Sequence, residues 1–143
     1  MGNAKPFVIP SLREWVGGEG NLVLTNKSRI VVDAKFATEL LPAATVFQND
    51  LFELTKLKPA VIVGIPKAGD IFMSLDGNTA ELGAEGYSLS IKEYVSIHAA
   101  QYKGAFWGTR SILQILEQDV TMRSLPRGIS RDYRKYEVRG LML

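Results

Sequence analysis

Cysteine is absent from this chain, and histidine occurs once among its 143 residues. Without cysteine the chain forms neither a disulfide nor a thiolate metal site. A zinc protease holds its metal with the two histidines of H-E-x-x-H, which a single His98 cannot supply. We therefore expect no metal and no cofactor, and we interpret His98 as a surface or interface residue rather than as a lone base or ligand.

The signatures of nucleophilic and phosphate chemistry are missing as well. No G-x-S-x-G elbow, which exposes the nucleophile of many hydrolases, surrounds Ser88, Ser90, Ser96 or Ser111. A phosphate-binding loop needs a lysine directly after its second glycine, whereas here Asp70 follows Gly69. The acidic residues are scattered, so no pair of them predicts general acid and base catalysis. We expect no catalytic residue in this chain.

Long apolar runs are absent too. None approaches the roughly 18 residues that span a bilayer, and no secretory signal opens the sequence, so we expect no membrane partner. An export signal removed before Met1 stays compatible with the sequence. The 46% apolar and 22% charged residues are ordinary for a globular protein, and 143 residues suit one domain.

The most informative stretch runs from residue 86 to residue 116. Its first half alternates apolar and polar residues twice, which predicts an antiparallel hairpin over 87–99. The rhythm then changes to a helical one, because a single apolar stripe contains Ala105, Thr109, Ile112, Leu113 and Leu116. A helix that follows such a ribbon can cover its apolar face.

The rest of the chain predicts further strands and one long helix. Residues 21–24 and 29–33 flank a turn-like segment, which suggests a first hairpin. Residues 34–54 carry a helical stripe with Pro42 inside it, and Pro42 should either kink the helix or mark its true start. The apolar run 60–65 is typical of a strand buried on both faces. The sum is an α+β fold: a mostly antiparallel or mixed sheet of five to seven strands with two helices on one face.

Two segments of the chain resemble a known family. The run KGAFWGTRSILQIL (residues 103–116) follows a strand that reads GYSLSI. It resembles the domain before the catalytic barrel in family-20 glycoside hydrolases, the β-N-acetylhexosaminidases, where G-x-F/Y-Y/W-G-x-x-T-L-x-Q-L is common. Ser111 and Ile112 stand where that family often has Thr and Leu. The last residues, YEVRGLML (136–143), are similar to the start of that family's barrel, R-G-x-M-L-D.

The resemblance implies a zincin-like accessory domain over residues 1–121. Residues 122–143 would then be a linker and the first strand of a missing catalytic (β/α)8 barrel. The implied partners are that barrel, in the same chain, and glycans that contain N-acetyl-hexosamine. Arg139 would bind sugar hydroxyls in the full-length parent. The resemblance also implies an exported protein (periplasmic, surface or secreted) rather than a cytoplasmic one.

By the same resemblance, the parent would remove terminal N-acetyl-hexosamine residues from glycans by substrate-assisted catalysis. The acetamido oxygen of the substrate attacks the anomeric carbon, an Asp orients the acetamido group, and a Glu protonates the leaving oxygen. Both acids would belong to the barrel, so the fragment alone would be no enzyme.

Two other classes of function stay open at this point. The chain could be the accessory domain of another carbohydrate-active enzyme. It could also be a free-standing nucleic-acid-binding α+β module, because residues 120–143 carry six basic and two acidic residues. We interpret that basic segment as a solvated linker and expect no nucleic-acid partner.

Overall fold

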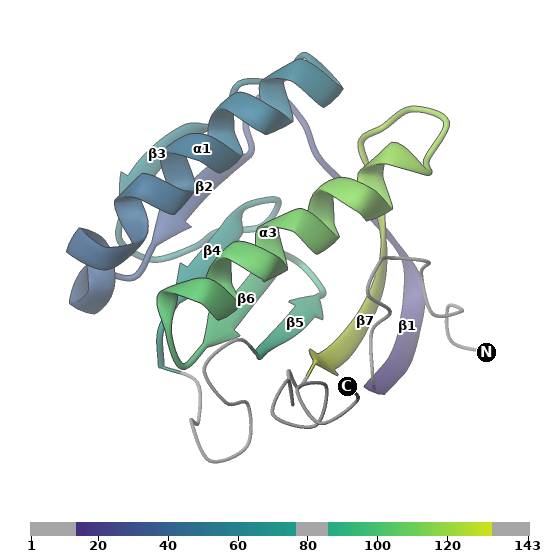
Figure 1. The fold of residues 1–143 in the computed structure, drawn as a ribbon. Coiled ribbons are helices and arrows are strands. Elements are labelled where there is room, and N and C mark those ends of the chain that lie inside the picture. The colour runs from purple at the N-terminus through teal and green to yellow at the C-terminus, as the bar shows by residue number, and fades with distance from the viewer. Residues whose placement is uncertain (1–13, 77–85, 133–143) are drawn as a thin grey trace, which may run out of the picture.

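The molecule has two layers, a mixed sheet and a pair of helices on one of its faces (Figure 1). The computed structural model describes residues 14–76 and 86–132, and within these ranges it contains seven strands and two α-helices. The strands are β1 (Glu14–Val23), β2 (Arg29–Val32), β3 (Ala60–Val63), β4 (Ile71–Ser74), β5 (Tyr87–Ile91), β6 (Val95–Ala99) and β7 (Ser124–Asp132). The helices are α1 (Ala37–Thr55), which follows the 3-10 turn η1 (Ala34–Phe36), and α3 (Tyr102–Glu117). The predicted α+β class is confirmed.

The strand order β1-β7-β5-β6-β4-β2-β3 joins a parallel half to an antiparallel half. Strands β3, β2, β4 and β6 run parallel to one another. The other three neighbouring pairs, β6 with β5, β5 with β7 and β7 with β1, are antiparallel. Helix α1 packs on β2 and β3, and α3 packs on β5, β6 and β7. The two helices therefore lie side by side and point the same way along the sheet (Figure 1).

The hairpin predicted over 87–99 is present as β5 and β6, with Tyr87 opposite Ala99 and Ile91 opposite Val95. Tyr87, Leu89 and Ile97 are fully buried beneath the helices, and Ser88 and His98 lie on the other face. The alternating pattern identified this pair because its partners are close in sequence and one face of each strand is buried.

The first predicted hairpin is wrong. The turn between β1 and β2 exists, since Ser28 N–H donates to the Thr25 carbonyl at 3.1 Å. However, it sends the chain to the far side of the sheet, where β2 pairs in parallel with β3 and β4, while β1 pairs with β7. A turn signal shows that the chain changes direction, but it does not say which strand lies next to which.

The strand predicted over residues 60–65 is also placed differently from expectation. β3 is an edge strand, not a strand buried on both faces, and Val63 is 48% exposed. It is an edge strand because α1 crosses over the sheet and returns the chain beside β2, on the side where no further strand follows among the described residues. Lys58-Pro59 before it and Pro66-Lys67 after it are residues that limit pairing at an open edge.

The prediction that the chain leaves the domain after residue 121 is wrong for residues 124–132. This segment is β7, an interior strand that pairs with β1 on one side and with β5 on the other. The sequence pattern did not reveal this strand, because only a few of its side chains, such as Leu125 and Ser130, are buried. Hydrogen bonds to the two flanking strands satisfy its backbone instead. Pro126, which lacks an N–H, lies where the β1 register shifts between Gly17 and Asn21.

Helix α3 is present, and four of the five residues of the predicted stripe are buried, namely Ala105, Thr109, Ile112 and Leu116. Ile112 and Leu116 are fully buried, whereas Leu113 is only partly buried at the edge of the contact. The centre of the buried face is made of small residues. An added Cβ on Gly104 would lie 2.2 Å from the Gly86 carbonyl oxygen, and one on Gly108 would lie 2.5 Å from Ile97 Cγ2. Glycine contributes nothing to an apolar stripe, so the sequence pattern missed this close approach of helix and sheet.

Pro42 lies inside α1, which begins at Ala37, so it does not mark the start of the helix. At this sixth position it removes one backbone hydrogen bond close to the N-terminus. Leu40, Phe47 and Leu51, three residues of the predicted stripe, are fully buried against the sheet, which confirms that face of the helix. Helix α1 then ends at Lys56, whose left-handed backbone lets its N–H donate to the Phe52 carbonyl at 2.9 Å.

Candidate functional site

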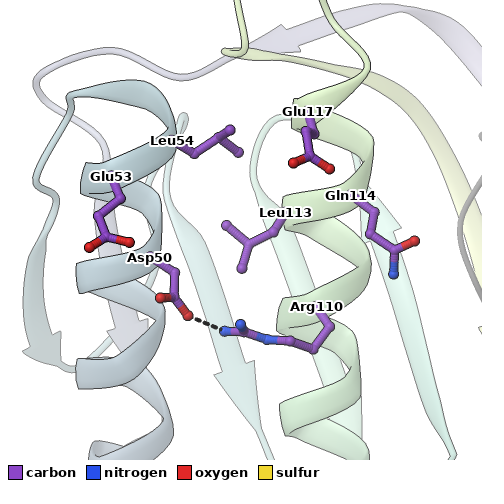
Figure 2. A pocket seen from close by; sticks show the side chains of 7 residues that line it. All are labelled: Asp50, Glu53, Leu54, Arg110, Leu113, Gln114 and Glu117. Atoms are coloured by element: carbon purple, nitrogen blue, oxygen red, sulfur yellow. Dashed lines mark ion pairs between the residues drawn. The ribbon is translucent and has the colours of Figure 1, made fainter.

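A groove of about 430 Å³ runs between α1 and α3 on the side of the helices that faces away from the sheet. Figure 2 shows its lining, in which Leu54 of α1 and Leu113 of α3 point toward each other between the two helices. Polar and charged residues surround this apolar floor: Asp50, Glu53, Arg110, Gln114 and Glu117. Leu113 is only partly buried because its side chain lines this groove.

One ion pair bridges the groove. The Arg110 guanidinium reaches from α3 to the Asp50 carboxylate of α1, with 2.7 Å between Nη2 and Oδ2 (Figure 2). The same guanidinium lies over the Phe106 ring, 4.9 Å from its centroid, which is within the range of a cation–π contact. Both partners of the ion pair are about one-quarter to one-third exposed, so the pair orients side chains more than it stabilises the fold.

Several apolar side chains on the helix surface around the groove are exposed or only half-buried. On α1, Val46 is 45% exposed, one turn before Asp50 and therefore on the same side of the helix. On α3, Phe106 and Trp107 are half-buried and pack edge to face, with ring centroids 5.9 Å apart. Aromatic residues and arginine are enriched at protein interfaces. We define Val46, Leu54, Phe106, Arg110 and Leu113 as the helix face.

A second charged cluster is buried and structural. The Asp70 carboxylate is 2% exposed and accepts from the Arg29 guanidinium, with 2.5 Å between Nη2 and Oδ2. It also accepts from the backbone N–H groups of Arg29 at 3.1 Å and Lys67 at 2.7 Å. Burial alone would raise the pKa of Asp70, but these hydrogen bonds and the charge of Arg29 outweigh it and hold the pKa below the ordinary value. The cluster ties the start of β2 to the loop before β4.

His98 lies on the sheet face opposite the helices, as a partly exposed residue of β6. Its Nδ1 is 2.5 Å from Oδ1 of Asp76, and its ring meets the Phe72 ring edge on at 6.0 Å. Desolvation raises the pKa of Asp76, but the hydrogen bond and charge of His98 lower it below the usual value. Asp76 is 54% exposed, so the pair is a surface contact, as the sequence suggested.

Three further sequence predictions concern Arg139, a metal site and a membrane partner. Arg139, the predicted sugar-binding residue, lies outside the described residues. Within residues 14–76 and 86–132, no three His, Cys, Asp or Glu residues come together as a metal site. No helix in these ranges is long and apolar enough to cross a membrane. No sequence pattern indicated the groove, because its lining depends on which helical residues remain outside the core.

The fold and the helix face define a two-layer α+β domain with a groove between its two helices. The sequence model described as "Glycosyl hydrolase family 20, domain 2" matches residues 5–133, and the chain belongs to this family. This finding confirms the resemblance noted in the sequence. It also places β7, residues 124–132, inside the family domain.

Three related proteins illustrate the match. The chain is 31% identical to a lacto-N-biosidase of Bifidobacterium bifidum over 141 residues, which cover 97% of this chain and 12% of that protein. Its fold is similar to an N-acetyl-β-hexosaminidase of Streptomyces plicatus (TM-score 0.77, 22% identity, 94% of this chain and 28% of that one). It is also similar to a family-20 β-N-acetylhexosaminidase of Streptomyces coelicolor A3(2) (TM-score 0.75, 21% identity, 92% and 28%). The chain thus spans about an eighth to a quarter of these relatives.

Proposed function

We propose that this chain is the accessory domain of a longer family-20 glycoside hydrolase and that its helix face docks on the catalytic (β/α)8 barrel of the same protein. The observation that carries the proposal is the helix face itself, which sets half-buried aromatic and aliphatic side chains around a groove. The family match and the small share of each relative that the chain covers support a larger parent. The domain would stabilise the barrel without contributing chemistry.

The proposed activity of the parent is the hydrolysis of terminal N-acetyl-hexosamine residues from glycans, by the substrate-assisted route given above. A second candidate, removal of a lacto-N-biose unit, is favoured by the 31% identity to the lacto-N-biosidase. Assays of the parent with aryl glycosides of N-acetylglucosamine and of lacto-N-biose distinguish the two. Turnover of neither glycoside would contradict both candidates.

Docking predicts different effects for two residues of α1 that are equally exposed. Val46 and Phe52 are each 45% exposed, but Val46 lies one turn from Asp50 on the groove side, whereas Phe52 lies on the other flank of the helix. In the parent, Val46→Asp should place a charge in the interface and lower the melting temperature of the barrel by at least about 2 °C, the shift that 1 kcal/mol causes in a domain of 150–250 residues. Differential scanning calorimetry measures this shift.

The matched control is Phe52→Asp, which should leave the barrel transition unchanged. Equal shifts for the two variants would show that they act on the domain and not on an interface. If neither variant changes the melting of the barrel, the helix face does not dock there.

For Arg139 we propose a contact with the sugar that is cleaved. Its guanidinium presents a planar fork of donors, which suits two neighbouring hydroxyl oxygens on one ring. Hydrogen bonds to a charged group are worth roughly 1.5 to 3 kcal/mol, so Arg139→Ala should lower kcat/KM of the parent at least about tenfold. Arg139→Lys should recover little. An Ala variant with the kcat/KM of the wild type would make Arg139 an ordinary surface cation.

A further inference from the structure

The groove between α1 and α3 is lined by more acidic than basic side chains, whereas the helix face around it is mostly apolar. Its lining contains Asp50, Glu53 and Glu117 against a single cation, Arg110. Arg110 is engaged by Asp50, which leaves Glu53 and Glu117. Both are exposed, and within the part of the chain that the structure describes neither forms a hydrogen bond or an ion pair. Two carboxylates therefore border an apolar floor without a counter-charge.

The positions of these two acids are unfavourable for the helices themselves. Glu53 lies two residues before the end of α1, and Glu117 is the last residue of α3. The C-terminus of a helix carries a partial negative charge, which repels acids and attracts cations. Neither helix has a basic residue in its last turn. Because α1 and α3 point the same way, their two negative ends lie at the same end of the pair (Figure 1), and each of the two acids belongs to the last turn of its helix.

One cation already reaches this end. The Arg123 guanidinium donates to the Thr55 carbonyl at 3.2 Å and so caps the C-terminus of α1. It is not part of the groove lining, and Glu117 gains no partner from it. Beyond α3 the next charged residue is Asp119, whose carboxylate accepts from Thr121 and from the backbone of Arg123. Among residues 14–76 and 86–132, the negative charge at the end of α3 thus has no basic partner.

We infer that the groove receives a basic side chain, lysine or arginine, from the catalytic barrel of the same protein. Its aliphatic stem lies between Leu54 and Leu113, and its charged end lies beside Glu117, while Glu53, on the flank of α1 away from α3, adds negative charge to the same region (Figure 2). A long basic side chain fits both parts of the groove, because lysine and arginine pack their stems on apolar surface while the charge stays at the rim. The inference rests on the proposed docking of the helix face and specifies what the barrel must present there.

The test uses charge reversal in the full-length parent, where local and interface effects have opposite signs. Glu117→Lys removes an acid from the C-terminus of α3 and adds a cation, so within the domain alone it should be stabilising. If a basic side chain of the barrel lies in the groove, the new lysine repels it and the parent loses stability. We expect Glu117→Lys to lower the melting temperature of the barrel and to shorten its thermal-inactivation half-life several-fold, and Glu53→Lys to do the same.

Two further variants separate the possible causes. Glu117→Gln, which removes the charge without reversing it, should have an effect of the same sign and smaller size. Glu93→Lys reverses an exposed charge in the turn between β5 and β6, outside the groove, and should change neither quantity.

A Glu117→Lys parent that melts at the same or a higher temperature would overturn the inference. If Val46→Asp still destabilises that parent, the helix face docks without a cation and the proposed function stands. If Val46→Asp is also silent, both proposals fail.

Discussion

Asp70→Ala should lower the free energy of unfolding of this chain by at least about 2 kcal/mol, a large part of the 5–15 kcal/mol that holds a domain folded. The carboxylate is 2% exposed and accepts from the backbone N–H of Lys67, the backbone N–H of Arg29 and the Arg29 guanidinium. Its removal leaves the two backbone N–H groups without their partner at a buried site, whereas the Arg29 guanidinium, 27% exposed, recovers part of its hydrogen bonding from water. Urea denaturation followed by circular dichroism measures the loss.

The same variant predicts a pH dependence. The pKa of Asp70 is lower in the folded chain than in the unfolded one, where it is about 3.9. Such a group contributes stability above its unfolded pKa, and this contribution is lost as the pH falls through its folded pKa. The difference in free energy of unfolding between wild type and Asp70→Ala should therefore be constant from about pH 5 to pH 8 and shrink below about pH 4.

Asp76→Ala is the control for this prediction. Asp76 is also an aspartate with a lowered pKa and an ionic partner, His98, but it is 54% exposed. Its replacement should cost less than about 1 kcal/mol. A loss at Asp76 as large as that at Asp70 would show that burial is not what gives Asp70 its importance.

Gly104→Ala should destabilise the chain by several kcal/mol, although the same change in an exposed helix is stabilising by about 1 kcal/mol. The added Cβ would lie 2.2 Å from the Gly86 carbonyl oxygen and 2.9 Å from the Ala99 Cβ. Backbone atoms of the sheet cannot move away as a flexible side chain can, so the whole of α3 must shift. The stability change should thus have the opposite sign to that of Gly→Ala in an exposed helix, and thermal denaturation measures it.

Gly108→Ala is the graded comparison. The atom that its Cβ would meet is Ile97 Cγ2, at 2.5 Å, which belongs to a side chain and not to the backbone. The loss of stability should therefore be smaller than for Gly104→Ala but should have the same sign. If both changes stabilise the chain, α3 lies farther from the sheet than described here.

Local patterns in the sequence predicted the elements whose partners are close along the chain. The alternation over 87–99 identified β5 and β6, because a hairpin pairs with itself. The same reasoning failed for β1, whose Trp15 lies opposite Ser130 of β7, more than a hundred residues away. No turn signal or periodicity encodes a pairing of that length. β3 was misjudged for a related reason, since an apolar run has the same composition at an edge as in the centre.

The candidate site was harder to predict than the fold. The stripe on α3 was right in Ala105, Thr109, Ile112 and Leu116, but it also included Leu113, which lines the groove. The stripe also left out Gly104 and Gly108, the two positions at which the helix approaches the sheet most closely. The ion pair joins Arg110 and Asp50, two residues that are 60 positions apart in sequence, so no spacing rule applies to it.

The position of β7 between β1 and β5 has a consequence for how the chain folds during synthesis. At 5–20 residues per second, about 110 residues separate the appearance of β1 from that of β7, a delay of roughly 5 to 20 seconds. Throughout that time β1 has no partner, and from the synthesis of residues 87–91 onward β5 has an open edge, because the strand that joins them has not been made. Until β7 is made and the sheet closes, the unpaired backbone of β1 and the open edge of β5 can pair with other chains. A gene truncated at residue 121 should accumulate as aggregate rather than as a smaller domain.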